Sequence, residues 1–240
     1  MRRRSLLLVV TSLNAALYAG LGAMWTLFPL ALFGVRFWPQ VFVPGAFAVL
    51  FGPWVGGVGA AVGIFVADVV YGHHDALLSL LVGVPSNLVA FSLIGHLSRR
   101  SHRRALRLVV IAIGIVIPLI LVAYGLYAFS GSEVASLATV GGIAITLIAI
   151  PYVGRSPWAD IEAASSIGLG VGSAIIGLGI VAYSSMFVTP QVLGLGSGSL
   201  PIYFAYGATL WTYMSEIPFL LLIMPPIVKA VRTAFPGLRD

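Results

Sequence analysis

Apolar runs long enough to cross a bilayer recur along the whole chain, and they constrain its fold more than any other feature. A membrane-spanning helix needs about 20 mainly apolar residues at a rise of about 1.5 Å per residue. We predict an all-α fold, a polytopic transmembrane helical bundle that forms a single membrane domain over residues 1–240. The predicted spans are 6–31, 39–51, 54–71, 77–97, 105–129, 134–153, 159–187 and 201–231.

The composition excludes a soluble globule. Hydrophobic residues make up 60% of the chain and charged residues only 8%, whereas soluble domains carry about 25% charged residues. The bilayer must therefore cover most of the surface. The chain has no cysteine, which excludes disulfides, thiolate catalysis and cysteine-based metal sites.

The positive charge is concentrated between the apolar runs. The formal net charge is +6, and basic residues cluster at Arg2–Arg4, Arg99–Arg107 and Lys229–Arg239. Cytoplasmic loops carry such clusters, so eight spans with both termini in the cytoplasm fit best, with Arg36 on the outer side. Counts of six or seven spans are the alternatives. The basic residues do not alternate with aromatic ones, which argues against nucleic acid as a partner.

Small residues recur on one face of the first span. Ala15, Ala19 and Ala23 are four residues apart and lie on one side of a helix. Small residues let membrane helices approach closely. The face either packs within the protein or docks on a partner.

The third span carries the acid that we expect to bind substrate on the outer side. It is rich in glycine and alanine, and Asp68 lies about one turn before its outer end, near Tyr71. A carboxylate there is costly unless it is paired or hydrated. It is available to a substrate amine or ring nitrogen, or it forms a salt bridge with Arg36. The following His73-His74-Asp75 is interpreted as a substrate lid rather than a metal site, since adjacent histidines on a helix face different ways.

The fourth and last spans contain further polar residues. Asn87 follows Pro85 in the fourth span, and a buried amide needs either another helix or a ligand as its partner. The last span has Tyr206, Thr209, Tyr213 and Glu216 at helical spacing, flanked by Trp211 and Thr212. An acid within a span indicates a functional site. A structural role for Glu216, as a buried or protonated anchor, is the alternative.

No catalytic motif is present, so we do not predict an enzyme. There is no Gly-x-Ser-x-Gly, His-Glu-x-x-His or phosphate-loop motif, and no cofactor or metal is expected. Without a nucleotide-binding motif, uphill transport would need an ion gradient or a partner protein.

Together, several segments resemble the S components of energy-coupling-factor (ECF) transporters. They are the alanine face of the first span, the outer segment Arg36-Phe37-Trp38-Pro39-Gln40, the short second helix ending Phe51-Gly52-Pro53, the glycine-rich helix that leads to Asp68, and the ending from Ile217-Pro218 through Pro225-Pro226 to Lys229.

The resemblance implies a subunit of the cell (plasma) membrane that captures a vitamin or similar small solute at the outer face. Its alanine face would dock on the T component, which couples to two cytoplasmic ATPases. The family usually has six spans, so two extra spans would lie within 100–190. The candidate substrate-binding residues are Arg36, Trp38, Gln40, Asp68, Tyr71, His73, Asn87, Thr209, Tyr213 and Glu216.

Two other classes of function remain open. A stand-alone proton-coupled secondary transporter would use Asp68 or Glu216 as its proton carrier, although no inverted repeat is visible. A membrane enzyme or assembly scaffold is the third reading, and the lack of a paired nucleophile and base argues against an enzyme.

Overall fold

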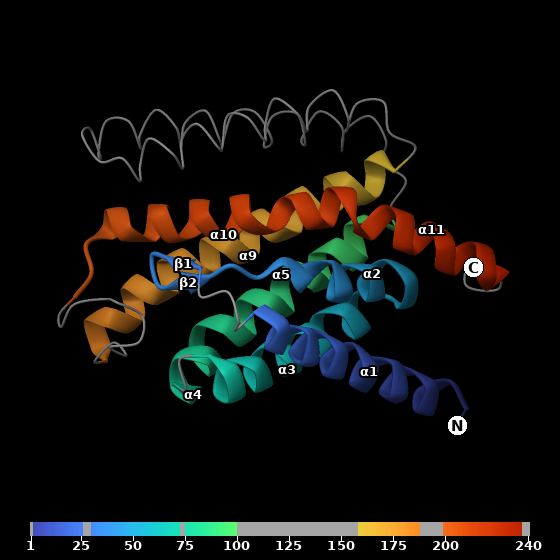
Figure 1. The fold of residues 1–240 in the computed structure, drawn as a ribbon, viewed down its shortest axis with the longest axis horizontal. Coiled ribbons are helices and arrows are strands. Elements are labelled where there is room, and N and C mark those ends of the chain that lie inside the picture. The colour runs from blue at the N-terminus through green and yellow to red at the C-terminus, as the bar shows by residue number, and fades with distance from the viewer. Residues whose placement is uncertain (1, 26–29, 73–74, 100–157, 188–198, 237–240) are drawn as a thin grey trace.

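The computed structural model describes residues 2–25, 30–72, 75–99, 158–187 and 199–236 (Figure 1). The elements in chain order are α1 (Arg2–Trp25), β1 (Ala31–Leu32), β2 (Val35–Arg36), η1 (Pro39–Val41), α2 (Phe42–Phe51), α3 (Pro53–Tyr71), α4 (Ala76–Leu78), η2 (Ser79–Gly83), α5 (Val84–Leu97), α9 (Ala159–Met186), α10 (Ile202–Leu222) and α11 (Met224–Ala234).

The predicted all-α membrane bundle is confirmed for this part of the chain. Five helical segments are long and apolar enough to cross a membrane, and the segment Pro39–Phe51 is a shorter apolar helix. Most of that short segment is buried, so it lies inside the bundle rather than facing lipid. The predicted spans 105–129 and 134–153 lie outside the described residues.

The chain termini and the hairpin lie at opposite ends of the helical bundle. The N- and C-termini lie at the same end, and the β1–β2 hairpin and α4 lie toward the other (Figure 1). Gly52, in the turn between α2 and α3, contacts Arg99, and the basic residues Arg4 and Lys229 belong to the terminal helices. Arg4, Arg99 and Lys229, described members of the three basic clusters, thus lie toward one end, whereas Arg36 lies in the hairpin at the other.

Lipid-facing surface is visible on α3. Val58, Val62, Val66 and Val70 are exposed by 37%, 49%, 42% and 52%. They recur every fourth residue and therefore share one face of the helix. Contact of such a stripe with water is unfavourable, whereas contact with lipid acyl chains is favourable.

The opposite faces of α3 are packed without room for a side chain. A Cβ added at Gly57 would meet Ser92 Oγ and would lie 2.7 Å from the carbonyl oxygen of Leu88 in α5. One added at Gly63 would lie 2.9 Å from the carbonyl oxygen of Ala15 in α1. The glycines of the third span thus serve close helix packing.

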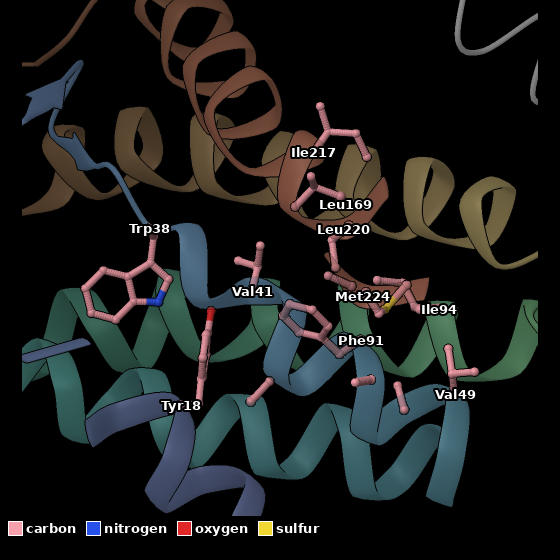
Figure 2. Close-up of a cluster of buried hydrophobic side chains, with 14 of the residues drawn as sticks. Tyr18, Trp38, Val41, Val49, Phe91, Ile94, Leu169, Ile217, Leu220 and Met224 are labelled. Carbon is pink, nitrogen blue, oxygen red and sulfur yellow. The ribbon is translucent and has the colours of Figure 1, made fainter. Parts of the chain in front are cut away.

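The buried apolar residues form two clusters, and one of them draws on most of the helices. Figure 2 shows Tyr18 of α1 beside Trp38, with Phe91 of α5 nearby and Ile217 and Leu220 of α10 above. The Tyr18 ring meets those of Trp38 and Phe91 edge to face, with centroids 6.2 and 6.1 Å apart. This geometry is favourable for aromatic pairs and fixes the segment that follows the hairpin.

The prediction that the first span runs to residue 31 is wrong. Helix α1 ends at Trp25, and Ala31 and Leu32 form β1, which pairs antiparallel with β2. The two turn residues Phe33 and Gly34 both have positive φ, 52° and 72°. A two-residue turn of this kind matches the twist of a hairpin. The apolar run continues through it, so hydropathy did not reveal the break.

The fourth span contains a π-helical turn. Asp75 caps the N-terminus of α4, because its Oδ1 accepts hydrogen bonds from the backbone N–H groups of Leu77 and Leu78, each at 3.0 Å. The π turn η2 follows, and α5 begins with Pro85 in its first turn. Turns of this kind occur frequently at functional sites, and η2 lies against the cavity described next.

Candidate functional site

A cavity of about 100 Å³ lies in the half of the bundle that contains the hairpin. Residues of α1, the hairpin segment, α3, η2, α5, α9 and α10 line it. An engineered protein cavity of about 150 Å³ admits benzene, so this one has the size scale of a small organic molecule. Most of its wall is apolar, and several polar side chains point to a binding site rather than a packing defect.

An ion pair between the hairpin and α3 forms one part of the cavity wall. Arg36 Nη2 lies 3.1 Å from Asp68 Oδ1, and the two side chains are 28% and 10% exposed. Arg36 Nη1 also donates to the carbonyl oxygen of Tyr71 at 3.0 Å, and its guanidinium lies 5.1 Å from the centre of the Trp38 ring. The salt-bridge alternative for Asp68 is therefore realised, within the cavity wall.

Asp68 also connects the ion pair to the π turn. Its Oδ2 accepts a hydrogen bond of 2.7 Å from Ser79 Oγ. Gly83, one turn further along, leaves room beside this oxygen, because a Cβ there would lie only 3.1 Å away. The π turn therefore brings a hydroxyl and a bare stretch of backbone to the carboxylate.

A second group of polar side chains, Tyr18 and Asn87, also lines the cavity. Tyr18 donates its phenolic hydrogen to Asn87 Oδ1 at 2.9 Å, and Asn87 Nδ2 donates to the Gly83 carbonyl oxygen at 3.0 Å. Asn87 thus joins α1 to α5 and also lines the cavity. Both interpretations that the sequence left open for it, helix–helix bonding and a place in the site, are compatible with this geometry.

The wall formed by α9 and α10 carries polar groups with unused bonding capacity. Ser173 is fully buried, and its Oγ has no hydrogen-bond partner among the described residues. Glu216 is 6% exposed, and the described part of the chain supplies no hydrogen bond or ion pair to its carboxyl group. Thr212, one turn before Glu216, donates to the Ala208 carbonyl at 2.7 Å.

The hairpin is held over the cavity by α10. Phe33 fills the space above Gly207, where a Cβ would meet its ring, and it meets Phe204 edge to face at 5.4 Å. Trp211 Nε1 donates to the Val35 carbonyl oxygen at 2.8 Å. Because Gly34, Val35 and Arg36 line the cavity, these contacts set the position of its roof.

Replacing Trp211 with Phe should loosen this roof. The change removes one partly buried hydrogen bond, worth about 1 kcal/mol, so amide exchange in residues 31–36 should quicken by roughly fivefold. Hydrogen–deuterium exchange of the detergent-solubilised protein measures this. Trp54→Phe, at a tryptophan that is 75% exposed, is the matched control. Equal exchange in the two variants would show that the Trp211 bond does not hold the hairpin.

The structure brings together half of the predicted binding residues. Arg36, Trp38, Asp68, Asn87 and Glu216 all line the cavity. They come from four separate predicted spans or loops, so their convergence depends on the tertiary fold.

The remaining predicted binding residues lie elsewhere. Gln40 is buried, with no hydrogen-bond partner for its amide group among the described residues. Tyr71 is exposed, and only its backbone carbonyl contacts a cavity residue, since it accepts the hydrogen bond from Arg36. Thr209 and Tyr213 face α9 at Gly177 and Gly170, so they pack helices together and are not in the cavity wall. His73 lies outside the described residues.

The alanine face of α1 lies against the bundle. Ala15 and Ala19 are 8% and 7% exposed, and Ala23 is partly buried. Ala15 packs on Gly63 of α3, which is the packing alternative for this face. A single chain does not test docking on a partner, so the docking role stays a prediction. It would require the face to be uncovered.

Several cavity residues were not predicted from the sequence. They are mostly small or aromatic side chains, namely Tyr18, Ser79, Ser86, Phe91, Ser173 and Thr212. In a membrane helix such residues also serve ordinary packing, so their type alone gave no signal. Ser79 lies in the cavity wall because of the π turn, and Ser173 because α9 packs on α10. Neither feature could be predicted from the sequence.

The described residues do not form the side-chain grouping of a metal centre. Within the described ranges, no three His, Asp or Glu residues are grouped closely enough to hold a metal ion. Comparison with known proteins adds no identification, since no family model, no curated protein and no solved structure matches this chain.

Proposed function

We propose that this chain is the S component of an ECF transporter, which captures a vitamin-like solute from outside the cell. The observation that carries the proposal is the cavity of about 100 Å³ under the hairpin, at the end of the bundle opposite the termini. With the basic clusters in the cytoplasm, the cavity lies toward the outer side of the plasma membrane.

Partner proteins supply the energy in this proposal. The sequence has no nucleotide-binding motif, and a binding subunit that feeds a T component and two ATPases needs none. The resemblance of the residue 36–40 segment and of the Ile217–Lys229 ending to the family supports the same assignment. The chain would have eight spans, two of them within residues 100–157.

Glu216 favours one competing function, a stand-alone proton-coupled transporter. A buried carboxyl without a partner among the described residues, in the wall of a cavity, is the type of group that carries protons through membrane proteins. This function would not need ATPases.

One experiment separates the two functions. The full chain is purified from its native membranes in mild detergent, and the associated proteins are identified. It is then reconstituted in liposomes, alone or with those subunits and ATP, and the liposomes are incubated with a metabolite extract of the source cells. The S-component proposal predicts that a T component and two ATPases co-purify and that one solute accumulates only with ATP. Accumulation by the chain alone, driven by a pH gradient, would overturn it.

A further inference from the structure

The charge balance of the cavity gives information on what it binds. Arg36, Asp68 and Glu216 are the ionisable Arg, Lys, Asp, Glu or His side chains in its described wall. If all are ionised, the wall carries a net charge of −1. A lone carboxylate at such a site is costly unless a positive group pairs with it.

Arg36 does not supply that positive group. Its guanidinium is already bound to Asp68 Oδ1 at 3.1 Å and to the Tyr71 carbonyl oxygen at 3.0 Å, and it packs on the Trp38 ring. An anionic solute would have to break this arrangement to reach a cation. The positive charge in the described wall is therefore neutralised within the protein.

Glu216 is in the opposite situation. It lies on α10, is 6% exposed, lines the cavity and has no hydrogen bond or ion pair in the described part of the chain. Nearby, the Ser173 hydroxyl is also buried without a partner. Both residues line the cavity, so they present a carboxyl group and a hydroxyl group to the same space.

We infer that the cavity binds a small organic cation, in which a protonated amine or a positively charged ring nitrogen pairs with the Glu216 carboxylate. Tyr18, Trp38 and Phe91 in the cavity wall provide aromatic surface for the rest of the molecule, and aromatic faces attract cations. Ser173 is placed to bond a further polar atom of the solute. This inference rests on the proposed function only in taking the cavity as the solute site.

The charge preference can be measured with probes of matched shape. Binding of benzylammonium, benzyl alcohol and benzoate to the detergent-solubilised full chain is followed by thermal stabilisation, with methylammonium and methanol as a smaller pair. A charge-assisted contact is worth about 1.5–3 kcal/mol, so an ammonium probe should bind at least about tenfold more tightly than its alcohol. The Glu216→Gln variant should lose this preference.

Glu162→Gln is the control, because Glu162 is also buried but does not line the cavity, and this variant should keep the preference. Two results with the wild type would each be enough to overturn the inference. One is benzyl alcohol or benzoate binding as tightly as benzylammonium, and the other is no binding of either ammonium probe. An unchanged preference in Glu216→Gln would also overturn it. ATP-driven uptake of a neutral or anionic solute would refute the cation site but not the proposed function. A preference for cations in a chain without ATPase partners would refute the proposed function but not the cation site.

Discussion

Gly57→Leu should leave little or no correctly folded protein. A Cβ at this position would meet Ser92 Oγ and lie 2.7 Å from the Leu88 carbonyl oxygen, so α3 and α5 would have to separate. Backbone atoms cannot rotate away as a flexible side chain can, and overpacking of this kind costs about 1–3 kcal/mol or more. For a marginally stable protein this is a large part of the total.

The control for this variant is Gly20→Leu in α1. Gly20 is exposed, and a Cβ there would meet nothing within 4 Å. Size-exclusion profiles and thermal unfolding in detergent should show a wild-type-like protein for Gly20→Leu and loss of the monodisperse peak for Gly57→Leu. Similar behaviour of the two variants would contradict the packing of α3 described above.

Arg36→Met should destabilise the protein by about 3 kcal/mol. It removes the positive partner of the Asp68 carboxylate, which is 10% exposed and also accepts a hydrogen bond from Ser79. Removing one partner of a buried pair costs about 3–5 kcal/mol. The double variant Arg36→Met/Asp68→Asn removes the uncompensated charge. It should recover most of the stability, within about 1 kcal/mol of the wild type.

Free energies of unfolding for the wild type, both single variants and the double variant form the test. A double variant as unstable as Arg36→Met would show that the pair is not coupled. Asp68→Asn also has a second readout. If the carboxylate contacts solute as well as Arg36, this change should weaken solute binding, and unchanged affinity would assign Asp68 to the structure alone.

The membrane fold could be predicted because its signals are long. The runs that became α3, α4 to α5, α9 and α10 to α11 each give a span whose predicted bounds differ from the observed ones by only a few residues. The basic clusters predict an orientation with both termini in the cytoplasm. The hairpin could not be predicted in the same way. Its strands have two residues each, too few to show any alternation, and apolar residues continue on both sides of Gly34.

The residues that line the cavity were predictable only where charge or position in the chain made them conspicuous. Asp68 and Glu216 stand out as acids in apolar runs, and both line the cavity. Thr209 and Tyr213 share a stripe with Glu216, yet they face α9, because Gly170 and Gly177 let that helix approach. Thr212 lies in the cavity wall instead. Helical spacing defines a stripe, but the neighbouring helix decides which side of it is available to a ligand.

The most direct test of the proposed role as a solute-binding subunit is native mass spectrometry of the gently purified protein and of its Ser173→Leu variant. Ser173 lines the cavity and its hydroxyl has no partner among the described residues, so a leucine there should fill cavity space without breaking a hydrogen bond. The account predicts a small molecule bound to the wild type and to Ser173→Ala, and none bound to Ser173→Leu, which should remain as heat-stable as the wild type. A wild type without any bound molecule, or a folded Ser173→Leu variant that carries the same one, would contradict it.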